Sequence, residues 1–104
     1  MPVELKYPHI EKVNGEPARL ERVPRVRVAQ MVMDHLSHGW SADEICRQYP
    51  HLTPAEVHSA LAYYYDHRDE IEREIERDWK MAEESATQSA RPPFLVRLLS
   101  KRKS

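Results

Sequence analysis

Two helix-start signals stand twelve residues apart in the middle of this chain. Ser41 is followed at the third position by Glu44, and Thr53 is followed in the same way by Glu56. Each pair can form a capping box, in which the hydroxyl and the carboxylate each accept a backbone N–H of the first helical turn. Pro54 stands at a first helical position, where its missing donor costs nothing. Two short helices joined by a tight corner predict a helix-turn-helix.

The composition indicates one small domain in a reducing compartment. A chain of 104 residues suffices for one domain. The single cysteine, Cys46, cannot form an internal disulfide. No apolar run approaches the roughly 18 residues that span a bilayer, and residues 1–6 lack the apolar stretch of a signal peptide. We therefore expect a cytoplasmic protein that has no membrane partner.

The net charge of −1 conceals a strong segregation of charge along the chain. Residues 1–28 carry six Lys or Arg against four Glu. Residues 29–65 carry one arginine against four acids, and residues 66–84 carry four bases against nine acids. Residues 91–104 then carry five bases and no acid. A basic tail that follows an acidic helix can fold back on that helix or reach a partner.

The amino-terminal residues predict a small β element. Residues 7–13 and 16–20 have the pattern of two hairpin arms. Asn14-Gly15 between them favours a type I′ turn, because both residues accept a positive φ. Residues 25–28 alternate basic and apolar side chains, which predicts a third short strand.

Apolar periodicity predicts four helices after this element. The first runs from Val28 to a left-handed cap at Gly39, the second over 41–49 and the third over 53–65. A fourth, acidic helix continues from a break at 66–67 to about residue 84. Its apolar seam is thin and must pack on the chain's own core or on a second copy; the seam residues are Ile71, Ile75 and Trp79.

An apolar cluster with basic flanks lies near the carboxyl end. Residues 91–93, Arg-Pro-Pro, are expected to stop any helix, and a basic terminus follows at 101–103. The cluster is separated from the main core and needs a surface to cover it, either a partner protein, this chain's own domain or a second copy. A membrane is disfavoured, because one short apolar turn would have to hold the anchor. The candidate partner-binding residues are Phe94, Leu95, Val96, Leu98 and Leu99.

Four segments of the chain occur in a family-like order and spacing: Tyr7–Glu11, the Gly-Trp-Ser turn at 39–41, Tyr49–Thr53 and Ala60–Ile71. Together they resemble a small bacterial domain-of-unknown-function family whose members look like VapB-type antitoxins. The resemblance covers roughly residues 7–78. It implies a homeodomain-like or winged helix-turn-helix behind a short β segment, and pairing with a PIN-like nuclease toxin encoded nearby. It also implies DNA binding, inferred largely from the fold.

The chain departs from that family before the first helix, where a Gly-Thr-Arg turn is usual. It carries arginines there instead: Arg19, Arg22, Arg25 and Arg27 lie within nine positions. These are the candidate DNA-binding residues, because phosphate neutralisation dominates affinity for duplex DNA. The third helix offers no Lys, Arg, Asn or Gln to contact bases. The alternative is that the arginines pair with the acidic fourth helix.

No catalytic or metal-binding arrangement is predicted. Cys46 falls on the buried side of a helix, where a thiol is inert. The acids stand at salt-bridge spacing on helix faces. Histidines such as His35 and His51 lack the His-Glu-x-x-His and Cys-x-x-Cys spacings of zinc sites. We expect no enzyme activity, no metal and no cofactor.

The sequence as a whole predicts a mainly α, homeodomain-like or winged helix-turn-helix protein. We expect a β element over 1–28, a helix-turn-helix core over 29–66, an acidic helix over 67–85 and a linker with a basic, apolar tail over 86–104. The expected function is an antitoxin-like regulator: a homodimer that binds a PIN-like toxin, with operator DNA as a second candidate ligand. The alternative is a dimeric structural or protein-interaction module that has no DNA binding.

Overall fold

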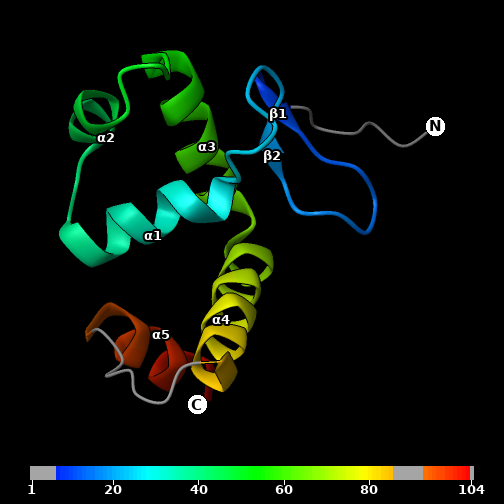
Figure 1. Ribbon diagram of the computed structural model, residues 1–104, viewed down its shortest axis with the longest axis vertical. Coiled ribbons are helices and arrows are strands. Elements are labelled where there is room, and N and C mark those ends of the chain that lie inside the picture. The colour runs from blue at the N-terminus through cyan, green and yellow to red at the C-terminus, as the bar shows by residue number, and fades with distance from the viewer. Residues whose placement is uncertain (1–6, 86–92, 104) are drawn as a thin grey trace.

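The computed structural model describes residues 7–85 and 93–103 (Figure 1). As predicted, these residues form a mainly helical fold with a short antiparallel hairpin at the amino-terminal side. The predicted linker at 86–92 lies outside the described residues. None of the helices within the described ranges is both long and apolar enough to cross a membrane. In chain order the elements are β1 (Ile10–Glu11), β2 (Arg19–Leu20), α1 (Val28–His38), α2 (Ala42–Gln48), α3 (Pro54–Asp66), α4 (Arg68–Ser85) and α5 (Pro93–Lys103).

Both helix starts that the capping pairs predict are present. At the start of α3, Thr53 Oγ1 accepts from Glu56 N–H (3.2 Å) and the Glu56 carboxylate accepts from Thr53 N–H (2.9 Å), so this capping box is complete. At the start of α2, Ser41 Oγ accepts from Glu44 N–H (3.2 Å). The Glu44 carboxylate accepts instead from Arg47 (2.8 Å), so the second box is only half formed.

Helix α1 lies at the centre of the helical core. It contacts α2, α3, α4 and α5 (Figure 1). It buries Val28, Met31 and Val32, the face that the i, i+3, i+4 spacing predicts. The helix ends at Gly39, whose φ of +70° is the left-handed cap expected of a residue without a Cβ. The other helices contribute to the same core the fully buried side chains of Ile45, Val57, Ile71, Ile75 and Leu95.

The amino-terminal hairpin is shorter than predicted. β1 and β2 have two residues each and pair antiparallel. In the loop between them, Glu16 N–H donates to Val13 O (2.9 Å), and Gly15 has a φ of +85°. Asn14 does not have a positive φ, so the predicted type I′ turn is wrong. The strand twist that selects this turn type does not act here, because the strands end before they reach the turn.

The predicted third strand at 25–28 is reduced to a single bridge. Arg27 pairs antiparallel with Arg19 of β2, through hydrogen bonds from Leu20 N–H to Val26 O (3.0 Å) and from Val28 N–H to Ala18 O (3.0 Å). Helix α1 already begins at Val28, and the side chain of Gln30 accepts the N–H of Arg27 (2.9 Å). Because the chain becomes helical from Val28 onward, the pairing with β2 stops after one bridge. β1 also packs on α3.

The apolar seam of α4 packs on the chain's own core. Helix α3 ends at the predicted break, where His67 N–H donates to Tyr63 O (2.9 Å). Beyond the break, Ile71 and Ile75 are fully buried, and Trp79 is half-buried against the same core. Of the two alternatives for this seam, the structure shows intramolecular packing.

The carboxyl-terminal apolar residues form α5, which docks on the chain's own domain. Pro93, which was expected to stop a helix, begins one, because the first helical position needs no donor. Val96 is 50% exposed. The remaining apolar residues lie against a core that includes α1 and α4; buried are Phe94, Leu95 and Leu98, and half-buried is Leu99.

Candidate interaction surfaces

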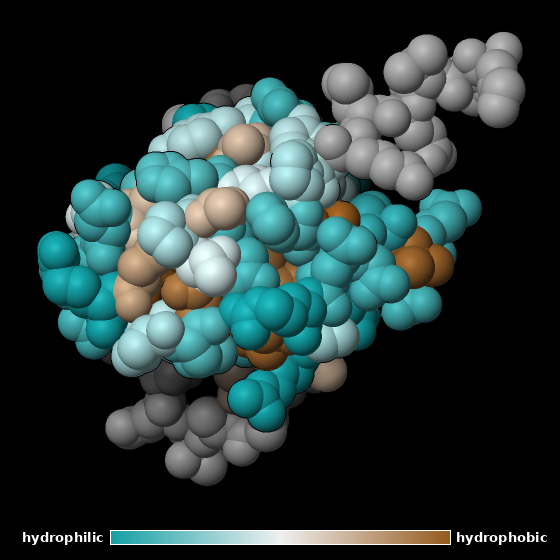
Figure 2. Space-filling model, turned by 90° about the horizontal axis from the view of Figure 1, so that it is seen from above, coloured by the Kyte–Doolittle hydropathy of each residue, from teal (hydrophilic) through white to brown (hydrophobic). Residues whose placement is uncertain are grey.

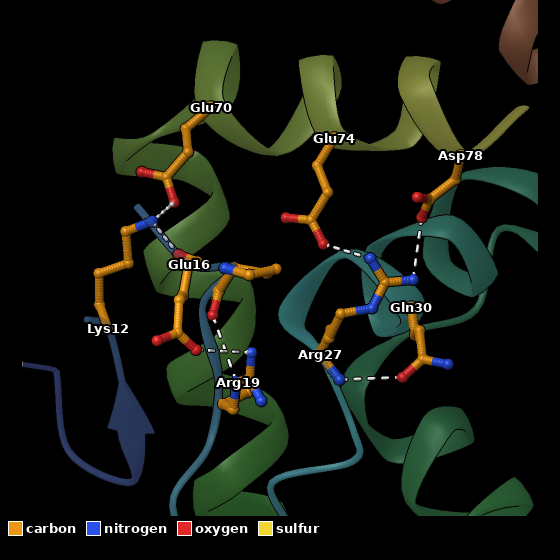
Figure 3. Close-up of polar contacts among 9 residues, drawn as sticks. Lys12, Glu16, Arg19, Arg27, Gln30, Glu70, Glu74 and Asp78 are labelled. Carbon is orange, nitrogen blue, oxygen red and sulfur yellow. Dashed lines mark hydrogen bonds and ion pairs between the residues drawn. The ribbon is translucent and has the colours of Figure 1, made fainter. Parts of the chain in front are cut away.

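The four arginines predicted to bind DNA do not share one surface. Arg27 forms ion pairs with Glu74 (2.6 Å) and Asp78 (2.9 Å) of α4 (Figure 3). Burial raises the pKa of the Glu74 carboxyl, and the Arg27 guanidinium opposes that rise. These contacts fasten the start of α1 to α4. For this residue, the structure shows the predicted alternative of pairing with the acidic helix.

Arg22 is also bound within the chain, at the helix-turn-helix corner. Its Nε and Nη2 donate to the two carboxylate oxygens of Glu56 at 3.0 and 2.8 Å. Nη2 also donates to the carbonyl oxygen of His51 (2.5 Å). The hydrogen bonds from Arg22, together with those from Thr53, lower the pKa of Glu56 to about 2. One buried carboxylate thus joins the linker before α1 to the start of α3.

Arg19 and Arg25 are not bound by buried acids. Arg19 makes an ion pair of 3.5 Å with Glu16 in the β1–β2 loop (Figure 3). Arg25 is exposed, and no carboxylate within the described residues pairs with it. Two of the four predicted DNA contacts are therefore engaged by buried acids, whereas Arg19 is half-buried with a long ion pair and Arg25 is exposed.

The exposed faces of α2 and α3 carry little positive charge. The cation of α2, Arg47, is ion-paired to Glu44 (2.8 Å). A helix that reads DNA usually presents Arg, Lys, Asn or Gln to the bases. On the face of the molecule seen in Figure 2, polar residues predominate and apolar residues form small separate areas. The exposed residues of α3 are Pro54, Ala55, His58, Ala62, Tyr65 and Asp66.

Several acids of α4 face the protein body, which sequence reasoning missed. The Tyr64 hydroxyl donates to Glu72 (2.9 Å) and the Tyr63 hydroxyl donates to Glu70 (2.9 Å). Burial is the largest cause that raises the pKa of both tyrosines, that of Tyr64 to about 12. The available signal was the position of Glu72 next to the apolar seam. Some of the carboxylates of α4 therefore accept hydrogen bonds from within the molecule.

An open cleft of about 310 Å³ lies between residues 25–34 and the corner at 49–52. The Tyr49 hydroxyl donates to the Asp34 carboxylate (2.5 Å), which raises the pKa of Tyr49 to about 12. The sequence did not predict this cleft, because its walls depend on how α1 meets the corner. The buried and half-buried apolar lining is Val26, Met31, Tyr49 and Leu52, and the polar lining is Arg25, Gln30, Asp34 and His51.

The described residues offer no arrangement for metal binding. Among residues 7–85 and 93–103, no three His, Cys, Asp or Glu gather as they would around a metal ion. Cys46 is half-buried, and its burial raises the pKa of the thiol. A catalytic cysteine needs the opposite shift, because the thiolate is the nucleophile.

Comparison with known proteins finds one similarity. Residues 22–64 match the family described as "Protein of unknown function (DUF433)". Neither the curated proteins nor the solved structures gave a match. The matched segment contains the Arg22–Glu56 pair, the cleft, α1, α2 and most of α3. Over this segment the chain is similar to a domain of unknown function.

Proposed function

We propose that this chain is an antitoxin-like regulatory protein that acts by binding a partner protein, a PIN-like nuclease toxin. Duplex DNA is at most a weak second ligand in this proposal. The observation that carries it is the engagement of Arg22 and Arg27 by the buried acids Glu56 and Glu74. A helix-turn-helix that lacks these cations is poorly equipped to neutralise phosphates and better suited to bind protein. The resemblance of the sequence to VapB-type antitoxins supports the choice of partner.

In this proposal the partner contacts the outer side of α5. Val96 is the exposed apolar residue of that helix, whereas Leu95 is fully buried. A partner that bound through Leu95 would first have to undock α5 from α1 and α4. The proposed active form is a homodimer. Because Ile71 and Ile75 are buried in the core, its contact lies outside the α4 seam.

Co-expression with the product of the neighbouring gene tests this function. We expect the tagged chain to co-purify with a PIN-like protein and to suppress its nuclease activity. Val96→Glu should weaken the complex. Val13→Glu is the matched control, because Val13 is about equally exposed (48% against 50%) but lies in the β1–β2 loop. A chain that purifies alone, with no partner encoded beside it, would overturn the antitoxin proposal.

The second candidate is a dimeric protein-interaction module that has no DNA role. The same observation favours it, because Arg22 and Arg27 are both bound by acids of this chain. Titration of generic duplex DNA tests the weak DNA role that the first proposal allows. Affinity that survives in the Arg22→Ala variant but is lost in the Arg19→Ala/Arg25→Ala variant would assign that role to Arg19 and Arg25. Absence of affinity at 50 mM salt, together with a chain that purifies without a toxin, would favour the module.

A further inference from the structure

We propose that the cleft beside the helix-turn-helix corner binds a peptide segment in which a hydrophobic side chain adjoins a carboxylate. The inference deepens the proposed function and rests on it, since the segment would belong to the partner protein. The cleft is defined by residues 25–34 of the linker and α1 and by residues 49–52 of the corner. It is separate from the contact proposed for Val96 on α5.

The cleft has room for a hydrophobic side chain and the group beside it. The apolar surface that a ligand can reach comes from Val26 and the ring of Tyr49, both half-buried, whereas Met31 and Leu52 line the cleft but are almost fully buried. A volume of about 310 Å³ lies at the lower end of the range of small-molecule sites. The cleft is open to solvent, so it cannot enclose most of a metabolite. A single anchor side chain from another protein would be covered well.

Three hydrogen-bond donors on the rim select a negative charge. Arg25 and the ring of His51 have no hydrogen-bond partner among the described side chains or backbone groups. Gln30 accepts the N–H of Arg27 through its carbonyl oxygen (2.9 Å), which leaves its amide group as a donor. Hydrogen bonds from a cation to a carboxylate are about twice as strong as neutral ones. The rim therefore favours a carboxylate beside the anchor side chain.

A carboxylate in the lining limits where the acid of the segment can lie. The Asp34 carboxylate already accepts from the Tyr49 hydroxyl (2.5 Å), and a second carboxylate next to it would be repelled. The acid of the segment is thus directed to Arg25, while the apolar side chain covers the lining. A DNA backbone would satisfy Arg25 but would leave the half-buried apolar surface of Val26 and Tyr49 uncovered. This comparison favours peptide over nucleic acid.

Titration of the full chain with a short peptide tests the site. The probe is a Gly/Ser octapeptide, blocked at both ends, that carries one leucine followed by one glutamate. We expect amide resonances of Val26, Leu52 and their neighbours to shift on addition. Arg25→Ala should weaken binding about tenfold, as does loss of one charge-assisted hydrogen bond. Arg73→Ala is the matched control, because Arg73 is an exposed arginine of α4 that lies outside the cleft.

Two control peptides and one competitor make the result decisive. Replacing the leucine by alanine, or the glutamate by glutamine, should each weaken binding about tenfold. Equal affinity for these peptides, equal effects of Arg25→Ala and Arg73→Ala, or the absence of any shift at millimolar peptide would overturn the site. Shifts of the same resonances with duplex DNA, while the peptide gives none, would assign the cleft to nucleic acid and also overturn it. If the toxin co-purifies although the peptide does not bind, the proposed function stands and this inference fails.

Discussion

At the scale of residues, two buried carboxylates hold the amino-terminal linker in place. Glu56 caps α3 and binds Arg22, and Glu74 binds Arg27. Their pKa values shift in opposite directions. Hydrogen bonds from Arg22 lower the pKa of Glu56, whereas burial raises the pKa of Glu74. The two sites should therefore respond to pH with opposite signs.

Glu56→Gln should lower the free energy of unfolding at pH 7 by about 1–2 kcal/mol, since the cap and the ion pair both weaken. The folded pKa of about 2 lies below the ordinary 4.5. The stabilisation is therefore complete above 4.5 and is lost as the pH falls toward 2. Urea unfolding from pH 7 to pH 3 should show the cost of the substitution shrinking. A cost that is the same at both ends would contradict this role.

Glu44→Gln is the control for that experiment. Glu44 caps nothing through its carboxylate, and its partner Arg47 is exposed on α2. Exposed pairs contribute little to stability. We expect this substitution to change the free energy of unfolding less than Glu56→Gln does. An equal loss in both variants would mean that the complete capping box of α3 contributes no more to the free energy of unfolding than the exposed Glu44–Arg47 pair does.

Arg27→Ala should destabilise the fold at pH 7 by about 3 kcal/mol, because it leaves the buried carboxylate of Glu74 without its cation. The pKa of Glu74, already raised, should rise further. A group with a raised folded pKa lowers stability as the pH rises through that value. The penalty should therefore be largest at neutral pH and smaller near pH 4. Arg25→Ala, which removes an exposed arginine two residues away, should change stability by no more than about 0.5 kcal/mol.

At the scale of elements, α5 packs on the domain of its own chain, which was one of several alternatives that the sequence allowed. Leu95→Ala should cost about 2–5 kcal/mol, as does removal of a fully buried leucine side chain. Val96→Ala, on the exposed side of the same helix, should change the free energy of unfolding by less than about 0.5 kcal/mol. Thermal and urea unfolding of both variants would measure the difference. Equal stability of the two variants would mean that α5 does not dock in solution.

The helix boundaries could be predicted because their signals are local. The Thr53–Glu56 pair and Gly39 each mark a helix end within a few residues of sequence. The β element could not be predicted in the same way. Whether residues 25–28 pair as a strand depends on where α1 begins, and Arg27 lies at that boundary. Pro93 is compatible both with the end of a helix and with a first helical position, so its local sequence does not determine which of the two it occupies.

The partners of the arginines could not be predicted from sequence for a different reason. Arg22 lies 34 residues from Glu56, and Arg27 lies 47 residues from Glu74. Spacing carries no information at such separations, and every acid in α4 offers the same charge. The sequence singles out the arginines and the apolar residues of α5 as candidate sites. Which of these residues are buried, and which side chains they contact, depends on the tertiary structure.

At the scale of the whole molecule, the segregated charges meet in space. The basic amino-terminal segment lies against α4, where Lys12 pairs with Glu70 (3.3 Å) and Arg27 with Glu74 (Figure 3). The excess charges of the two segments therefore offset one another within the fold. Few of the cations near the helix-turn-helix remain to attract a polyanion, since affinity for DNA follows the number of phosphates neutralised.

The affinity of the full chain for generic duplex DNA, measured at 50 and 200 mM salt, is the most direct test of this conclusion. Because Arg19 and Arg25 are the two of the four arginines not bound by buried acids, and the proposed dimer would double them, we predict weak binding that falls by about a hundredfold over this range. The Arg19→Ala/Arg25→Ala variant should show no affinity. Tight binding that falls a thousandfold or more, as about six or more phosphate contacts produce, would contradict the internal engagement of Arg22 and Arg27.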